Sequence, residues 1–153
     1  QRFKGWMAQP RWDDLDLLYF VGYALWNYVS FPRLLELPGV EVRPIRGGRM
    51  GQPTLLAARF PDDIPTHSAE QYFHLDADGL LLRHDYVAEV FGNWAAGANH
   101  CVRSETVEGL RFYTRRRVTP SLGRWASLPF PTLVWIDLNE IMVHWTRKVR
   151  RDG

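Results

Sequence analysis

The chain has 153 residues with 19 basic and 17 acidic side chains, and this near balance excludes a global field that would capture nucleic acid or an anionic membrane. Its length suits one domain, so we predict a single domain over residues 1–153. The sequence begins at Gln1 rather than Met, and this prediction allows for strands that precede it. The single cysteine, Cys101, excludes an intramolecular disulfide and favours a reducing, cytoplasmic compartment.

Residues 12–30 predict a helix. Asp13 suits the N-cap, and Asp14 and Asp16 place negative charge in the first turn, where the helix dipole favours it. From Leu15 onward apolar residues cover nearly the whole circumference, which is typical of a helix that is buried or crosses a membrane. The apolar run is shorter than the ~20 residues that span a bilayer. We therefore predict no transmembrane segment, and a core helix whose residues 15–29 are sequestered from water on every side.

Phe31-Pro32 breaks this helix, a short turn over 33–36 follows, and the pattern then becomes alternating. A glycine turn at Gly47, Gly48 and Gly51 and a three-residue loop ending at Gly79 separate strands. The predicted strands are residues 40–45, 55–60, 67–76, 80–90, 101–107, 110–119, 132–138 and 141–145. One helix followed by hairpins predicts an α+β fold, in which a curled antiparallel sheet (a half-barrel) wraps around one long apolar helix.

The hairpin around Gly79 is rich in groups that exchange protons. Its turn puts Tyr72 opposite His84 and Glu70 opposite Tyr86. A carboxylate, an imidazole and two phenols on one face can move protons near neutral pH, so these four residues are our candidate catalytic set. His74, opposite Leu82, would share the face. The alternative is a solvated outer face, and a shift of one residue in register would scatter the set.

Arg116 is the arginine that we expect to meet a ligand. It shares a strand face with Phe112, Thr114 and Val118, and these neighbours predict that the face is the inner one. A buried arginine needs an acidic partner or an anionic ligand. The alternative is a salt bridge to Asp137 or Glu89.

Other motifs support weaker hypotheses. The pair His100-Cys101 could join a thiolate to a base, but adjacent strand residues point to opposite faces. The five histidines lack the spacing of a metal site, so we predict no metal. The basic stretches 111–117 and 147–151 contain no recognition module, and we predict no specific nucleic-acid partner.

Three stretches resemble the lipoprotein-carrier-like half-barrel superfamily: AEQYFHLDADGLLLRHDYVAE, EGLRFYTRRRVTP and LVWIDLNEIMV. They match its hairpin with D-x-x-G, its later G-L-x-x-P/Y-T-R strand and its closing alternating strand. The resemblance implies an incomplete barrel that holds a hydrophobic ligand against an apolar helix. Those carriers have strands before the helix and are exported, whereas about eleven residues precede the helix here and no signal peptide is visible. The helix segment also resembles a group of uncharacterised proteins of actinobacterial type.

The leading functional hypothesis is binding of a hydrophobic, lipid-like or polycyclic small molecule between helix and sheet, without a cofactor. The aromatic share of 14% suits an apolar cavity as well as a large core. The expected ligand-binding residues are Tyr19, Tyr23, Trp26, Phe73 and Arg116, with His84 as another polar handle. One alternative is a cofactor-independent cyclase, isomerase or hydrolase that uses His84 as base and a tyrosine as donor. Another is a protein-interaction subunit, and the oligomeric state is open.

Overall fold

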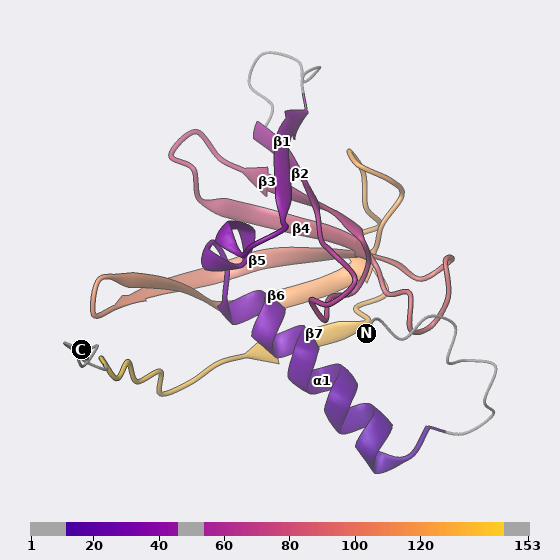
Figure 1. Ribbon diagram of the computed structural model, residues 1–153, viewed down its shortest axis with the longest axis horizontal. Helices are drawn as coiled ribbons and strands as arrows, with labels where there is room; N and C mark the ends of the chain where they lie inside the picture. Colours follow the sequence, from indigo (N-terminus) through magenta and orange to yellow (C-terminus); the bar gives the residue numbers. More distant parts are fainter. Residues whose placement is uncertain (1–11, 46–53, 146–153) are drawn as a thin grey trace, which may run out of the picture.

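The computed structural model describes residues 12–45 and 54–145, which form an α+β fold with an antiparallel sheet. The helical elements are α1 (Asp14–Val29) and the 3-10 turn η2 (Arg33–Glu36). The strands are β1 (Glu41–Ile45), β2 (Thr54–Arg59), β3 (Glu70–Leu75), β4 (Leu81–Val87), β5 (Ala96–Val107), β6 (Leu110–Pro120) and β7 (Val134–Asp137). Each strand pairs with the next along the chain, in the order β1 to β7, and the sheet twists strongly from one edge to the other (Figure 1). The predicted α+β class and antiparallel sheet are confirmed.

The start of α1 follows from its capping residues. The Asp13 carboxylate accepts hydrogen bonds from the backbone N–H groups of Leu15 at 2.9 Å and Asp16 at 3.0 Å. The Asp16 side chain in turn accepts one from the N–H of Asp13 at 3.2 Å. This reciprocal arrangement is a capping box, and it confirms the predicted N-cap. None of the described helices has the length and apolarity that a membrane span requires.

The expectation that α1 is sequestered on every side is wrong. Only Ala24, Asn27 and Tyr28 of the helix are buried, whereas Leu15 is 73% and Leu18 67% exposed. The reason is that the C-terminal half of α1 packs on the sheet, while the N-terminal half extends beyond the strands (Figure 1). The sheet therefore does not enclose the helix along its length.

Most strands lie where the alternating pattern predicts them. β5 is longer than the predicted strand over 101–107 and includes Gly97 and Asn99. The predicted strand over 141–145 is wrong, because these residues form no strand. The predicted glycine turn at Gly47, Gly48 and Gly51 falls outside the described residues.

A β-bulge decides the register of the β3–β4 hairpin. Gly79 has a φ of +80°, as its left-handed turn position requires, and Leu75 pairs with Leu81. The register then shifts between His74 and Leu75, so that Leu82 is an extra residue of β4 and Phe73 pairs with His84. The predicted pairing of Tyr72 with His84 is therefore wrong by one residue.

The sheet has two different faces. We call inner the face that packs on α1 and η2; its two apolar clusters are centred on Phe73 and on Tyr86. The opposite, outer face is contacted by residues 121–129, which we call the outer loop, through Arg83, His100 and Arg117. Successive residues of one strand alternate between these faces.

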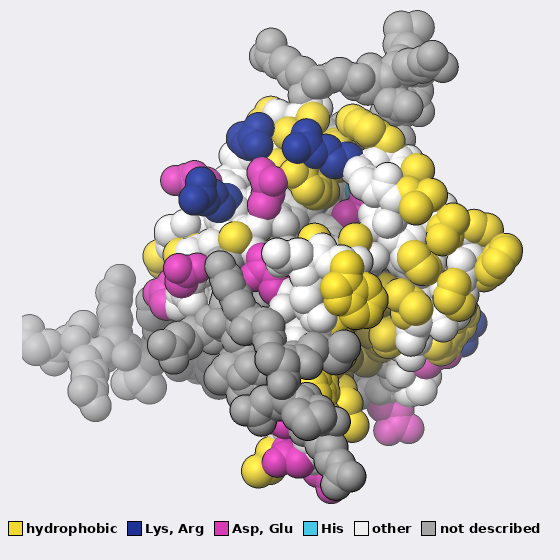
Figure 2. Space-filling model, turned by 90° about the vertical axis from the view of Figure 1, so that its right-hand side faces the viewer, with side chains coloured by type: hydrophobic (Ala, Val, Ile, Leu, Met, Phe, Trp, Pro, Cys, Tyr) yellow, Lys and Arg dark blue, Asp and Glu magenta, His cyan; other side chains and the backbone are white. Residues whose placement is uncertain are grey.

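Apolar side chains are also frequent on the surface. On the face shown in Figure 2 they gather at the right of the view, apart from a mixed group of basic and acidic side chains. Large exposed apolar residues of the outer loop, the segment after it and β7 are Leu122, Trp125, Leu128, Phe130, Leu133 and Trp135.

Candidate functional site

An open groove of about 600 Å³ lies between the chain that follows α1 and the inner side of the sheet. The end of α1, η2 and the turns that join β3 to β4 and β5 to β6 line it, mostly with apolar side chains. The apolar lining residues are Val29, Phe31, Pro32, Leu35, Leu56, Leu75, Leu80, Leu110, Phe112 and Tyr113. Sites for small molecules have volumes of roughly 300–1,000 Å³ and mainly apolar walls, so the groove has the size and character of such a site.

Aromatic contacts fix the floor of the groove. Phe31 stacks on Phe73 with ring centroids 5.3 Å apart and meets the Tyr113 ring edge-on at 6.0 Å. The Tyr113 hydroxyl accepts a hydrogen bond from the backbone N–H of Leu81 at 2.7 Å, and burial raises the pKa of this phenol. Packing on one side and a hydrogen bond on the other hold the ring in place, so the floor is preorganised.

Charged side chains stand at the rim of the same groove. Arg33 pairs with Glu36 at 2.8 Å within η2. Arg111 donates to the Ser104 hydroxyl at 3.1 Å and forms no ion pair with any described residue. An anionic group in the groove would find in Arg111 a cation that no carboxylate of the described residues neutralises.

The predicted ligand-binding residues lie outside the lining of this groove. Tyr19 and Trp26 are exposed on α1, and Tyr23 is half-buried against the His67 ring at 5.2 Å. Phe73 is buried directly behind Phe31, where it supports the floor.

Arg116 lies one layer further in, buried behind the floor. Arg116 is 1% exposed, and its guanidinium stands 5.1 Å and 5.4 Å from the ring centroids of Tyr28 and Tyr113 and donates to the Tyr28 carbonyl at 2.7 Å. No described carboxylate pairs with it. The alternative partner Asp137 instead receives both bonds of the neighbouring Arg115, at 3.0 and 3.1 Å. Aromatic faces and a backbone carbonyl thus surround a buried cation.

A polar cluster fills the inner face next to Arg116. The Tyr28 hydroxyl contacts the Tyr86 hydroxyl at 2.5 Å and the Nε2 of His67 at 3.0 Å. The Nε2 of His84 contacts the Gln71 amide oxygen at 2.6 Å. Burial lowers the pKa of His67 to about 3 and that of His84 well below its usual value, and it raises the pKa of Tyr86 to about 12. These groups are therefore uncharged at neutral pH, and the cluster serves to join α1 to the sheet.

The bulge separates the candidate catalytic set. His84 and Tyr86 are buried on the inner face, whereas Tyr72 lies on the outer face and bonds through its hydroxyl to the Glu70 carboxylate at 2.6 Å. That hydrogen bond is the main cause of the lowered pKa of Glu70. Because the sheet stands between the two pairs, His84 and Glu70 cannot act on one substrate atom.

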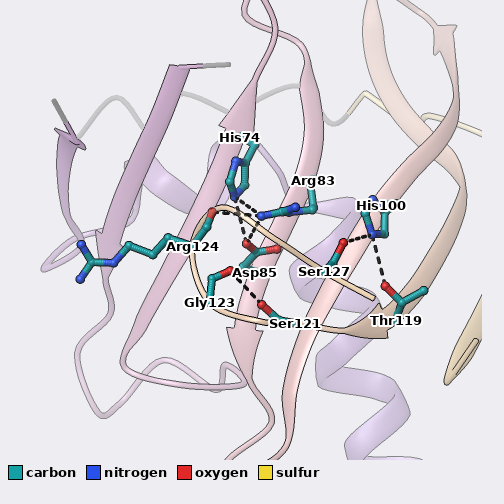
Figure 3. Close-up of polar contacts among 9 residues, drawn as sticks. All are labelled: His74, Arg83, Asp85, His100, Thr119, Ser121, Gly123, Arg124 and Ser127. Atoms are coloured by element: carbon teal, nitrogen blue, oxygen red, sulfur yellow. Dashed lines mark hydrogen bonds and ion pairs between the residues drawn. The ribbon is translucent and has the colours of Figure 1, made fainter. Parts of the chain in front are cut away.

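The outer face carries an ionic cluster below the outer loop (Figure 3). The Nε2 of His74 lies 2.9 Å from a carboxylate oxygen of Asp85, and Arg83 contacts that same oxygen at 2.8 Å. Arg83 also donates to the carbonyl of Arg124 in the outer loop at 3.0 Å. His74 and Asp85 are buried, and their contacts with Arg83 tie the loop to the sheet.

Sequence reasoning missed the residues of the groove and of this cluster. Leu35 lies in η2, Leu80 just before β4 and Leu110 at the start of β6, where the sequence offers only short apolar stretches without a helical period. Arg83 and Asp85 alternate on β4 and therefore project from the same face of the sheet. The contact with His74 required the register shift.

No three His, Cys, Asp or Glu side chains of residues 12–45 and 54–145 come together as a metal site requires. The chain matches no family model, no curated protein and no solved structure. The half-barrel resemblance therefore stays a prediction.

Proposed function

We propose that the protein binds a hydrophobic small molecule, with an apolar tail and an anionic head, in the open groove next to η2. The observation that carries this proposal is the groove of about 600 Å³ with its mainly apolar lining. Contact between apolar surface and water is unfavourable. A ligand tail that covers the groove therefore gains roughly 25 cal/mol for each Å² of apolar surface that it removes from water. The half-barrel arrangement that the sequence predicts would serve this function as an open rather than an enclosed chamber.

The walls define the ligand class. Leu35, Leu56, Leu75 and Leu80 offer aliphatic contact without hydrogen-bonding groups, which suits an alkyl chain or a fused-ring system. Arg111 at the rim provides the charge for a carboxylate, sulfate or phosphate head. It takes over the role of polar handle that the sequence assigned to Arg116 or His84, because both of these are buried behind the floor.

Two measurements test this proposal. Native mass spectrometry of gently purified protein should show a co-purified mass in the range of a lipid or polycyclic compound. Titration with a fluorescent fatty acid should show saturable binding, and the uncharged alcohol of the same chain should bind at least tenfold more weakly to the wild type. Equal affinities for the acid and the alcohol would show that Arg111 does not bind the head group. The apolar groove would then remain the proposed site for the tail.

A matched pair of variants locates the site. Leu80 lines the groove, whereas Leu82, two residues along the chain, lies outside its lining and is 42% exposed. The Leu80→Trp substitution should weaken binding of the fluorescent fatty acid at least tenfold by filling the groove, and Leu82→Trp should leave it unchanged. Equal affinities of the two variants would show that the probe binds elsewhere and would refute the proposal.

A further inference from the structure

The outer face contains a second hollow, of about 400 Å³, on the opposite side of the sheet from the groove. Strands β5 and β6 form its base and the outer loop forms one wall. Its lining residues are His100, Val102, Arg117, Thr119, Ser127, Leu128 and Pro129. A base, two hydroxyls and a cation thus share one small space that is open to solvent.

The hydroxyls converge on one nitrogen. The Nε2 of His100 lies 3.3 Å from the Ser127 Oγ and 3.3 Å from the Thr119 Oγ1 (Figure 3). A distance of 3.3 Å is at the long end for a hydrogen bond, as is common for catalytic pairs before a substrate binds. Thr119 stands on β6, whereas the outer loop brings Ser127 to His100 from 27 residues along the chain. A serine and a histidine at this spacing have the geometry of a nucleophile and its base.

Arg117 supplies a fixed positive charge beside this pair. It pairs directly with His100 across β5 and β6, so the two side chains project from the same face. Its Nε donates to the Thr132 hydroxyl at 2.9 Å and one terminal nitrogen donates to the Pro129 carbonyl. These bonds hold the guanidinium in position, and its other terminal nitrogen can donate to an oxygen in the hollow.

The surroundings of His100 favour the uncharged form of its imidazole. Burial lowers the pKa of His100, and the charges of Arg83 and Arg117 lower it further against the opposing effect of Asp85. His74, the other titratable neighbour, also acts to lower it. In the tautomer that carries its proton on Nδ1, the Nε2 of His100 has a lone pair that can accept the serine proton.

We propose that Ser127 is a nucleophile activated by His100, and that the outer hollow hydrolyses small carboxylic esters. The Ser127 Oγ bonds to the ester carbonyl carbon as its proton passes to the His100 Nε2, and Arg117 stabilises the negative carbonyl oxygen. The bond to the alcohol oxygen then breaks, and this oxygen takes the proton from Nε2. A water molecule attacks the acyl-serine in the same way, which releases the carboxylic acid and restores Ser127. The balance is ester plus water to acid plus alcohol.

The hollow limits the substrate. Val102, Leu128 and Pro129 give an apolar wall on which an acyl or aryl group can lie. A volume of about 400 Å³ accepts a short acyl chain or one aromatic ring rather than a long lipid. The activity is independent of ligand binding in the groove on the other face, and the two sites can be tested separately.

The proposal is tested on the full chain with a fluorophosphonate probe, which labels activated serines, followed by peptide mass spectrometry. We expect the label on Ser127 of the wild-type protein, loss of the label in Ser127→Ala, and labelling at least tenfold slower in His100→Gln. Hydrolysis of p-nitrophenyl acetate should fall in parallel. Absence of label from wild-type Ser127 would overturn the proposal without any variant.

Ser121 gives a matched control within the same loop. Its hydroxyl donates to the Gly123 carbonyl at 3.1 Å and has no histidine partner among the described residues. In the Ser121→Ala variant, the fluorophosphonate should therefore label Ser127 at the wild-type rate. Label that remains on the protein in Ser127→Ala, or a His100→Gln variant that labels as fast as the wild type while its circular dichroism is unchanged, would refute the assignment of nucleophile and base.

Discussion

The hydroxyl of Tyr28 in α1 lies 2.5 Å from the hydroxyl of Tyr86 in β4. Both rings are buried, and the Tyr28 hydroxyl also contacts the Nε2 of His67. This pair is a polar link between α1 and the sheet, and it lies within the apolar cluster that Ala24, Tyr28, Tyr86 and Ala88 form.

The Tyr28→Phe substitution should destabilise the protein more than Tyr86→Phe. Removing the Tyr28 hydroxyl leaves both Tyr86 and the Nε2 of His67 without a partner, and each unsatisfied buried group costs about 1–3 kcal/mol. Removing the Tyr86 hydroxyl leaves Tyr28 its bond to His67. Urea unfolding of both variants and of the double variant measures the coupling. Additive losses would show that the two hydroxyls do not interact.

Acid should destabilise the protein through His67 and His84. Burial depresses the folded-state pKa of both, to about 3 for His67, so stability is full above the unfolded value near 6.5 and falls as pH drops below it. Each histidine contributes a loss of up to about 1.4 kcal/mol per pH unit. Urea unfolding at pH 7, 6 and 5 measures the slope. His84→Gln should reduce this slope, and an unchanged slope would contradict the assignment.

Arg116→Lys should be less stable than Arg116→Met. Neither variant keeps the bond to the Tyr28 carbonyl in its present geometry, but lysine keeps a charge that is more strongly hydrated and that no described carboxylate neutralises. We expect lysine to cost about 1–2 kcal/mol more than methionine. Arg115→Met, which removes an exposed pair with Asp137, serves as control and should cost less than about 1 kcal/mol. If the lysine variant proved the more stable, Arg116 would have an anionic neighbour.

Deletion of Leu82 should leave the pairing of β3 with β4 intact. Leu82 is the extra residue of the bulge, so its loss would place Leu81 opposite Leu75 and Arg83 opposite His74 in a regular ladder, with Asp85 still on the outer face. The Leu82→Ala substitution keeps the register and should change stability by less than about 0.5 kcal/mol, because this side chain is 42% exposed. Circular dichroism melts compare the two. A deletion variant that no longer folds would contradict this prediction and show that the bulge itself is required.

Local signals in the sequence predicted the elements and much of their order. Asp13 and Asp16 mark the start of α1 because a capping box needs only four consecutive residues. Gly79 marks the turn between β3 and β4 because few other residues adopt its positive φ. The inner position of Arg116 also follows from the sequence, since its strand neighbours alternate.

The tertiary structure alone decided which groups meet. One extra residue at Leu82 placed His84 and Glu70 on opposite faces, and no short-range pattern marks that position as a bulge. The exposure of Leu15 and Leu18 depends on where the sheet ends relative to α1, which an apolar periodicity cannot report. The approach of Ser127 to His100 depends on the path of the outer loop across the strands. Caps and turns are properties of neighbouring residues, whereas register, coverage and convergence arise from packing between distant ones, and for this reason the sequence determined the elements and only the folded chain determined the sites.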